Sequence, residues 1–127
     1  MKKLFPLVLA VLLLAGCAAP AEAGSYRQIN MDEAITMMGE ESGYVILDVR
    51  TPEEFAEKHI PGAINVANET IGTDEIPELP DKDQLILVYC RSGNRSKQAS
   101  EKLAALGYTN IVEFGGINDW PGETVTG

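Results

Sequence analysis

From residue 26 onward, short apolar runs alternate with polar stretches along the chain. Several of the runs have the length of buried strands, and they lie at residues 44–47, 63–66, 85–89 and 111–114. Between them lie segments with apolar residues at helical spacing. Strands that alternate with short helices predict a single α/β domain with a mainly parallel sheet over residues 26–127.

Two capping signals indicate where helices begin. Asn30 is followed three residues later by Glu33, and this capping box predicts a helix from that point. Thr51 and Glu54 repeat the pattern with a proline between them, which favours a second helix. We expect that second helix to end near Ile60, where a Pro-Gly pair follows.

The remaining pattern predicts one more helix and a long loop. Residues 97–106 have an apolar stripe and end before Gly107, a residue type favoured just past a helix. Residues 67–82 are acidic and contain two prolines, so we expect mostly loop with room for one helical turn.

A cysteine closes the apolar run at 85–89 and begins a short polar turn. The turn, here called the Cys90 loop, is Cys90-Arg91-Ser92-Gly93-Asn94-Arg95-Ser96. A strand, a turn and a helix start would surround the thiol with unpaired backbone N–H groups, which stabilise an anion together with the helix dipole. The alternative is a small buried residue at a strand end, which is common for free cysteine.

Basic residues crowd the start of this predicted helix. Arg91, Arg95 and Lys97 lie there, and the first acidic residue is Glu101. Cations are mildly unfavourable at a helix N-terminus unless an anion is also present. We therefore expect the loop to favour the Cys90 thiolate and to attract a small anion.

The rest of the chain is acidic, with a formal net charge of −9. This balance argues against nucleic acid as a partner and against attraction to an anionic lipid surface. No residue spacing typical of metal ligands and no cofactor motif is present in the sequence, so we expect neither a metal nor a cofactor.

The first 16 residues have the pattern of a secretory signal peptide. Two lysines precede an apolar core over residues 4–14, and small residues follow. The core is too short for a comfortable membrane span. Without the two leader lysines the formal net charge changes from −9 to −11.

Leu14-Ala15-Gly16-Cys17 resembles the lipobox of bacterial lipoproteins. In that family the cysteine becomes the first residue after cleavage and receives several acyl chains, which anchor firmly. The resemblance implies a signal peptide over 1–16, a lipidated Cys17 with a tether through residue 25, and a membrane contact through the lipid alone. The protein would then lie in the cell envelope, on the periplasmic side in a diderm source.

With Cys17 lipidated, Cys90 is the one free thiol of the chain. No intramolecular disulfide is then available, and there is no C-x-x-C pair. A lone exported thiol risks oxidation, so its presence indicates chemical use.

Several motifs, in the same order along the chain, resemble the signature of the rhodanese superfamily. They are Asp48-Val49-Arg50, Glu54-Phe55, His59-Ile60-Pro61-Gly62-Ala63-Ile64-Asn65, the Cys90 loop, Gly107-Tyr108 and Gly115-Gly116-Ile117-Asn118-Asp119-Trp120. The resemblance covers nearly all of residues 26–127. It implies the compact three-layer rhodanese α/β fold and thiosulfate-type sulfurtransferase chemistry.

The resemblance also implies roles for the loop residues. In this family the loop cysteine takes sulfane sulfur from a donor such as thiosulfate or a persulfide, and passes it to cyanide, a thiol or a protein. Cys90 would be the nucleophile, and Arg91 and Arg95 would attract the anionic oxygens of the donor. The persulfide anion would be stabilised by the backbone N–H groups of Arg91, Ser92, Gly93, Asn94, Arg95 and Ser96.

Structural roles explain other parts of the signature. Arg50 is expected to pair with Glu54 and to join a strand end to the next helix. His59, the one histidine of the chain, is not used as a base in this family, and we assign it no chemical role. Trp120 is expected to anchor the core.

Two alternative functions stay open from the sequence. Related domains with a Cys-to-Arg phosphate loop are phosphatases or arsenate reductases, but those loops have five residues between Cys and Arg, whereas four separate Cys90 from Arg95. A shorter loop favours a single sulfur atom over a tetrahedral oxyanion. The second alternative is a persulfide carrier or protein-interaction module that does not turn over alone.

Overall fold

The computed structural model describes residues 25–127. The predicted signal peptide, Cys17 and most of the predicted tether lie outside the described residues. In the part that is described, no helix has the length and apolar character needed to cross a membrane.

A five-stranded sheet forms the centre of the domain, with strand order β1-β5-β4-β2-β3 and every neighbouring pair parallel. The strands are β1 (Arg27–Gln28), β2 (Val45–Asp48), β3 (Ile64–Asn65), β4 (Ile86–Cys90) and β5 (Ile111–Gly116). The predicted parallel sheet is confirmed, and the strand that ends in the cysteine lies at its middle.

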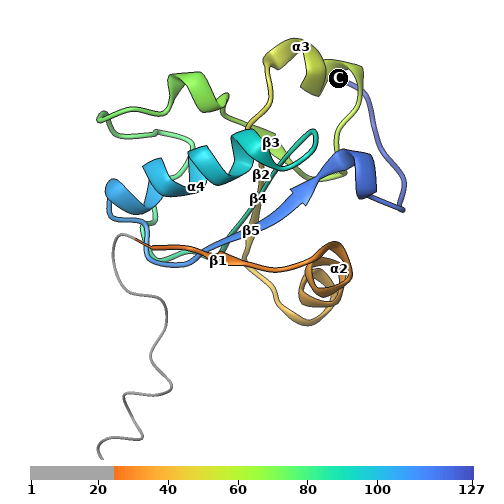
Figure 1. Ribbon diagram of the computed structural model, residues 1–127, viewed down its shortest axis with the longest axis horizontal. Coiled ribbons are helices and arrows are strands. Elements are labelled where there is room, and N and C mark those ends of the chain that lie inside the picture. The colour runs from red at the N-terminus through yellow and green to blue at the C-terminus, as the bar shows by residue number, and fades with distance from the viewer. Residues whose placement is uncertain (1–24) are drawn as a thin grey trace, which may run out of the picture.

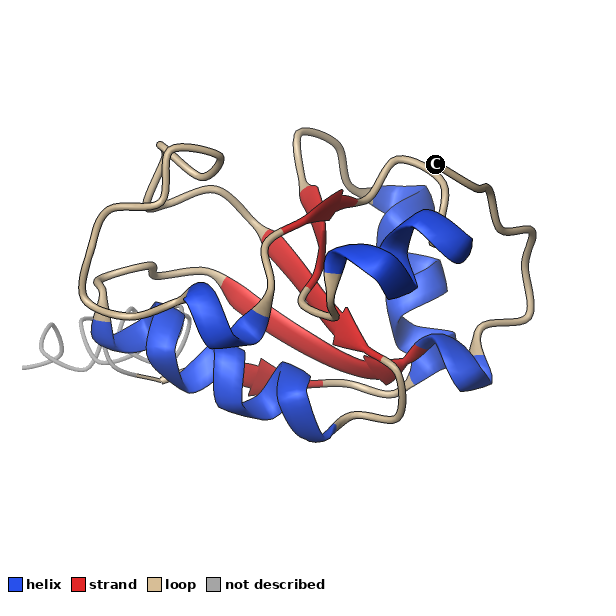
Figure 2. Ribbon diagram, turned by 90° about the horizontal axis from the view of Figure 1, so that it is seen from above, coloured by secondary structure: helices blue, strands red, loops and turns tan. Residues whose placement is uncertain are grey.

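Helices cover the two faces of this sheet. They are α2 (Met31–Glu40), α3 (Pro52–Glu57) and α4 (Asn94–Ala105), with 3-10 turns η1 (Asn68–Thr70) and η2 (Ile117–Asp119). In Figure 1, α4 lies above the sheet and α2 below it, while α3 lies beyond the end of the strands; Figure 2 shows the same layers from above. The architecture is the predicted three-layer α/β arrangement.

Both predicted capping boxes are present. Asn30 Oδ1 accepts from the N–H of Glu33 at 2.8 Å, and Glu33 Oε1 accepts from the N–H of Asn30 at 2.9 Å. Thr51 and Glu54 make the same reciprocal pair at the start of α3. Each box satisfies backbone donors that the first turn of a helix leaves unpaired.

Two helix boundaries differ from the predictions. The second helix, α3, ends at Glu57 rather than near Ile60, because the backbone of Lys58 is extended and His59 pairs instead with Val125 in an antiparallel bridge. The helix after β4 begins at Asn94, three residues before the predicted start at 97, so the loop's last residues form its first turn. The two-residue strand β1 and the turn η2 are too short to show a hydrophobic period, and they were not predicted.

The alternation of side chains along β4 decides where the thiol points. Val88 and Cys90 belong to the core cluster beneath α4, which also contains Leu103. Leu87 and Tyr89 belong to the cluster on the α2 side. Because neighbouring residues of a strand face opposite sides of the sheet, Cys90 is directed toward α4.

Candidate active site

Cys90 is the last residue of β4 and is 1% exposed. It lies at the carboxyl ends of the parallel strands, where ligands bind in open α/β sheets. The N–H of Gly93 donates a hydrogen bond to its Sγ at 3.0 Å. The thiol sulfur therefore already has a backbone donor directed at it.

The turn after Cys90 leads directly into the first turn of α4. Gly93 is the N-cap, with φ at +111°, a left-handed conformation that favours glycine. No side chain caps the helix, and its first turn contains no acidic residue. The backbone donors of Asn94, Arg95 and Ser96 thus begin the helix without a carboxylate cap at its positive end.

Gly116 allows β5 to pass close beneath the loop. A Cβ atom at this position would lie 2.0 Å from the carbonyl oxygen of Arg91 and 2.6 Å from the nitrogen of Ser92. The N–H of Asn118 also donates to the Arg91 carbonyl at 3.1 Å. The close approach explains why the Gly-Gly pair belongs beside the loop, although it lies far away in the sequence.

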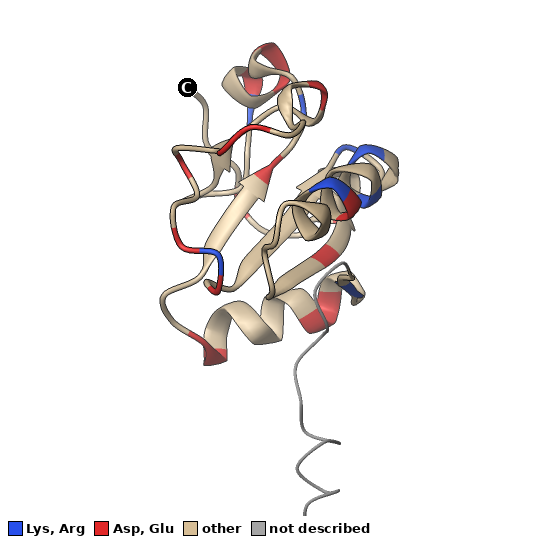
Figure 3. Ribbon diagram, turned by 90° about the vertical axis from the view of Figure 1, so that its left-hand side faces the viewer, with Lys and Arg blue, Asp and Glu red and all other residues tan. Residues whose placement is uncertain are grey.

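Three of the predicted site residues form the exposed rim of the loop. They are Arg91, Ser92 and Asn94, whereas Gly93 and Ser96 are buried beneath them. Figure 3 shows basic positions along α4, and acidic positions at both ends of α2. The loop is thus a local basic region on an acidic domain, as the charge pattern predicted.

Arg95 forms a bidentate ion pair with Glu54 of α3. Its two terminal nitrogens lie 2.8 Å and 3.1 Å from the two carboxylate oxygens. The hydrogen bond from Arg95 lowers the pKa of Glu54 to about 2. Glu54 and, more weakly, Cys90 raise the pKa of Arg95. The guanidinium is therefore close enough to Cys90 to interact with it, but it is shared with a carboxylate.

The prediction that Arg50 pairs with Glu54 is wrong. Its guanidinium pairs with Asp48 at 2.7 Å, both side chains are buried, and Glu54 is occupied by Arg95. The same guanidinium donates to the carbonyl of Lys58 at 2.7 Å. Arg50 therefore still joins the end of β2 to the end of α3, but through its own strand's carboxylate and a backbone oxygen.

Sequence reasoning missed Glu113, which lies under the Cys90 loop. This β5 residue is 2% exposed, and its Oε2 accepts from Ser96 Oγ at 2.5 Å and from the N–H of Gly115 at 3.0 Å. Ser96 Oγ in turn accepts from Cys90 Sγ at 3.4 Å. The signal in the sequence was one acidic residue inside an apolar strand.

His59 and Trp120 both make structural contacts, and Trp120 packs on the core as expected. His59 is buried, its Nδ1 lies 2.8 Å from the carbonyl oxygen of Phe55, and its ring stacks on that of Phe55. Trp120 packs against the core cluster on the α2 side, and its indole N–H donates to the carbonyl of Glu123.

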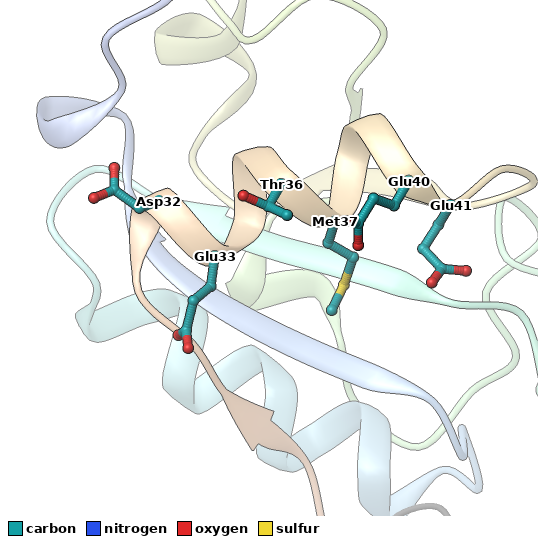
Figure 4. Close-up of a pocket in the computed structure, with 6 residues that line it drawn as sticks. All are labelled: Asp32, Glu33, Thr36, Met37, Glu40 and Glu41. Carbon is teal, nitrogen blue, oxygen red and sulfur yellow. The ribbon is translucent and has the colours of Figure 1, made fainter.

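Two hollows in the described residues lie outside the Cys90 loop. One, of about 280 Å³, lies on α2 (Figure 4). It is lined by Asp32, Glu33, Thr36, Met37, Glu40 and Glu41. The other, of about 270 Å³, lies between Pro52, Asn65 and the 75–78 segment. Among residues 25–127, no group of three His, Cys, Asp or Glu side chains is placed to hold a metal ion. The Cys90 loop offers the chemistry of a thiol among N–H donors and guanidinium groups.

The chain is similar to known proteins in sequence and fold. Residues 30–123 match the family model of the rhodanese-like domain. The chain is 38% identical over 73 residues to the thiosulfate sulfurtransferase PspE of Escherichia coli, covering 58% of this chain and 70% of that protein. It is 32% identical over 107 residues to the thiosulfate sulfurtransferase GlpE of Pseudomonas entomophila, covering 80% and 94%.

A solved structure, described as rhodanese with anions from E. coli, has the same fold. It is 36% identical in sequence, with a TM-score of 0.60, over 66% of this chain and 99% of that one. The family match covers most of the described residues and includes the Cys90 loop and the closing Gly-Gly segment. This chain belongs to the rhodanese-like domain family.

Proposed function

We propose that this protein is a sulfurtransferase that moves sulfane sulfur through a persulfide on Cys90. The observation that carries the proposal is the hydrogen bond from the N–H of Gly93 to Cys90 Sγ at 3.0 Å, at the start of a helix that no side chain caps. Such a position stabilises a sulfur anion by backbone donors and by the helix dipole. The sulfurtransferase relatives of the chain support the same activity.

The first half-reaction loads the sulfur. The Cys90 thiolate attacks the outer sulfur of thiosulfate, a new S–S bond forms at Sγ, and the bond between the outer sulfur and the sulfonate sulfur breaks. Sulfite leaves with the electron pair of that bond. The terminal persulfide sulfur then has the negative charge, and the N–H groups of residues 91–96 are the donors that stabilise it.

The second half-reaction returns the enzyme to its starting state. A thiophile such as cyanide attacks the terminal sulfur, thiocyanate forms, and the electrons of the broken S–S bond return to Cys90 as a thiolate. A low-molecular-weight thiol or the thiol of a partner protein reacts by the same exchange. No cofactor is needed, because the donor supplies an already oxidised sulfur.

Two cations are positioned to attract the donor. Arg91 lies on the exposed rim, and Arg95 lies near Cys90 with its guanidinium held by Glu54. We assign the encounter with thiosulfate to Arg91 and the orientation of its oxygens to Arg95. The bidentate pair fixes the Arg95 side chain in one position, and the Glu54 carboxylate partly neutralises its charge.

One observation favours a second candidate, a persulfide carrier. Cys90 is 1% exposed, so a persulfide formed there would be shielded from thiols in bulk solvent. A shielded persulfide suits delivery to a docked protein rather than turnover with small acceptors. A phosphatase is disfavoured, because the loop has one residue fewer than phosphate loops and its Arg95 is engaged by a carboxylate.

Thiosulfate-dependent formation of thiocyanate tests the proposal. The wild-type chain is expected to form thiocyanate from thiosulfate and cyanide, whereas Cys90→Ser is expected to form none while keeping its circular-dichroism spectrum. Activity in the Cys90→Ser variant would overturn the mechanism. Loading from thiosulfate without transfer to cyanide would assign the carrier role, and turnover of para-nitrophenyl phosphate would assign a phosphatase.

We also propose that the mature protein is anchored in the cell envelope through acyl chains on Cys17. Its support is the lipobox-like sequence that follows a short apolar core. Metabolic labelling with palmitate in a bacterial host tests this: the wild-type chain is expected to take up label and to fractionate with membranes. A Cys17→Ala variant that retained the label would contradict the proposal.

A further inference from the structure

Glu113 is a buried acid with an unusual set of partners. Glu113 and Asp48 are the two buried acids among the described residues, and Asp48 has Arg50 at hydrogen-bond distance. Glu113 has hydrogen bonds from Ser96 and Gly115, and its nearest ion-pair partner is Lys97, with Nζ at 3.9 Å. A buried carboxylate whose one ion pair is long and made by a half-exposed lysine is costly, so this acid needs a specific reason to remain under the loop.

Ser96 connects this acid to the thiol. A hydroxyl has one proton to donate, and among the acceptors near Ser96 Oγ the closest is Glu113 Oε2, at 2.5 Å. The Gly93 and Gly115 carbonyl oxygens lie farther away, at 3.0 Å and 3.4 Å. Hydrogen bonds to a charged acceptor are the shorter and stronger ones, so the Ser96 proton points to Glu113. The lone pairs of Ser96 Oγ then accept from the Cys90 thiol, at 3.4 Å.

We propose that Ser96 and Glu113 form a proton relay that takes up the proton of the Cys90 thiol. The thiol proton moves to Ser96 Oγ while the hydroxyl proton of Ser96 moves to Glu113 Oε2. The carboxylate becomes a neutral acid, and Cys90 becomes a thiolate that accepts hydrogen bonds from Ser96 Oγ and from the N–H of Gly93. Two protons move, and the site keeps both of them and one negative charge throughout.

The surrounding charges suit a site that holds one negative charge rather than two. Lys97 Nζ lies 3.9 Å from Glu113 and donates to the Gly93 carbonyl, while Arg95 interacts with Cys90 but is shared with Glu54. Two adjacent buried anions repel each other strongly. Proton transfer from Cys90 to Glu113 keeps the site at one negative charge and avoids two adjacent anions.

The relay predicts a distinctive pH profile for the thiol. While the pair holds one proton, the fraction present as Cys90 thiolate depends on the balance between the two sites and not on pH. Without the carboxylate, the thiol must release its proton to water, and the thiolate fraction rises about tenfold per pH unit until ionisation is complete. The inference deepens the proposed function, because it states how the attacking thiolate is formed.

Alkylation by iodoacetamide tests the relay without any sulfur transfer, so its outcome is independent of the sulfurtransferase proposal. The rate is followed on the Cys90 peptide of the full chain by mass spectrometry, between pH 6 and 8. For wild type we expect the alkylation rate to change by less than about threefold across this range. For Glu113→Gln we expect a rise with pH of at least about tenfold. Glu101→Gln, an exposed acid on α4, is the matched control and should keep the wild-type profile.

Ser96 provides an independent check should Glu113→Gln fail to fold. Ser96→Ala removes the bridging hydroxyl and is expected to give the steep profile, whereas Ser96→Thr retains a hydroxyl and is expected to restore the flat one. Equal profiles for wild type, Glu113→Gln and Ser96→Ala would overturn the relay. A steep profile for the wild-type protein would overturn it as well.

Discussion

Arg95 and Glu54 join the first turns of two helices, through contacts of 2.8 Å and 3.1 Å between guanidinium and carboxylate. Arg95 lies in the first turn of α4 near the thiol, and Glu54 belongs to the capping box of α3. The pair holds the arginine near Cys90 and partly neutralises it. The same contact therefore affects both anion binding and stability, and each effect can be measured.

Removal of the Arg95 side chain is expected to weaken the binding of thiosulfate selectively. We predict that Arg95→Ala raises KM for thiosulfate about tenfold, the size of one charge-assisted hydrogen bond partly shared with Glu54. The KM for a neutral persulfide donor should change far less. Lys102→Ala, in the last turn of α4, serves as the control for loss of one positive charge. An equal loss for both donors would show that Arg95 does not bind the anion.

Removing the carboxylate is expected to change acid stability. Arg95 lowers the pKa of Glu54 to about 2 from an ordinary 4.5, so the pair stabilises the folded state above pH 4.5. That contribution is lost as the pH falls from 4.5 to 2. We predict that Glu54→Gln unfolds about 1 kcal/mol more easily than wild type at pH 7, with a smaller difference at pH 2.5, in urea denaturation.

A matched variant separates the ion pair from the capping box. Glu33 occupies the same capping position in α2 and is exposed. Glu33→Gln should therefore lower stability less than Glu54→Gln does. Equal effects of the two variants at both pH values would attribute the loss to the cap alone.

Because β5 passes close to the Cys90 loop, we expect that Gly116 cannot be replaced by a larger residue without disturbing the loop. A methyl group there would collide with the Arg91 carbonyl, so Gly116→Ala is expected to destabilise by about 1–3 kcal/mol and to abolish sulfur transfer by displacing the loop. Gly39→Ala is the control, because a Cβ atom in this α2 position meets nothing within 4 Å. That control should stabilise the fold by about 0.5–1 kcal/mol. Thermal unfolding and the thiocyanate assay measure both effects, and an active Gly116→Ala would contradict the account of the loop.

Removing one charge of the buried Asp48–Arg50 pair is expected to destabilise the fold strongly. Asp48→Asn leaves a buried guanidinium without its counter-charge, which typically costs about 3–5 kcal/mol. Combining Asp48→Asn with Arg50→Met removes the orphaned charge and should recover part of this loss. A double variant less stable than Asp48→Asn alone would mean that the charge on Arg50 is satisfied by other groups.

Local patterns predicted the local parts of this structure. Asn30 with Glu33, and Thr51 with Glu54, are each three residues apart, and both capping boxes formed as expected. The apolar run before Cys90 gave the central strand for the same reason, since burial on both faces requires an uninterrupted apolar segment.

Contacts between distant segments could not be predicted in this way. A pair between Arg50 and Glu54 was expected to join a strand end to the next helix. Arg50 binds Asp48 instead, and Glu54 binds Arg95, 41 residues away. Glu113 was missed for a similar reason. Its place under the loop depends on the register that sets it against Val88 of β4, with an irregularity before Cys90 meets Gly116.

Mass spectrometry of the protein after incubation with thiosulfate tests the central claim most directly. We predict that the peptide containing Cys90 gains the mass of one sulfur atom, that cyanide removes this mass, and that Cys90→Ser gains none. A wild-type Cys90 peptide that stays unmodified after thiosulfate, or an added sulfur found on another residue, would contradict a persulfide on Cys90 as the intermediate.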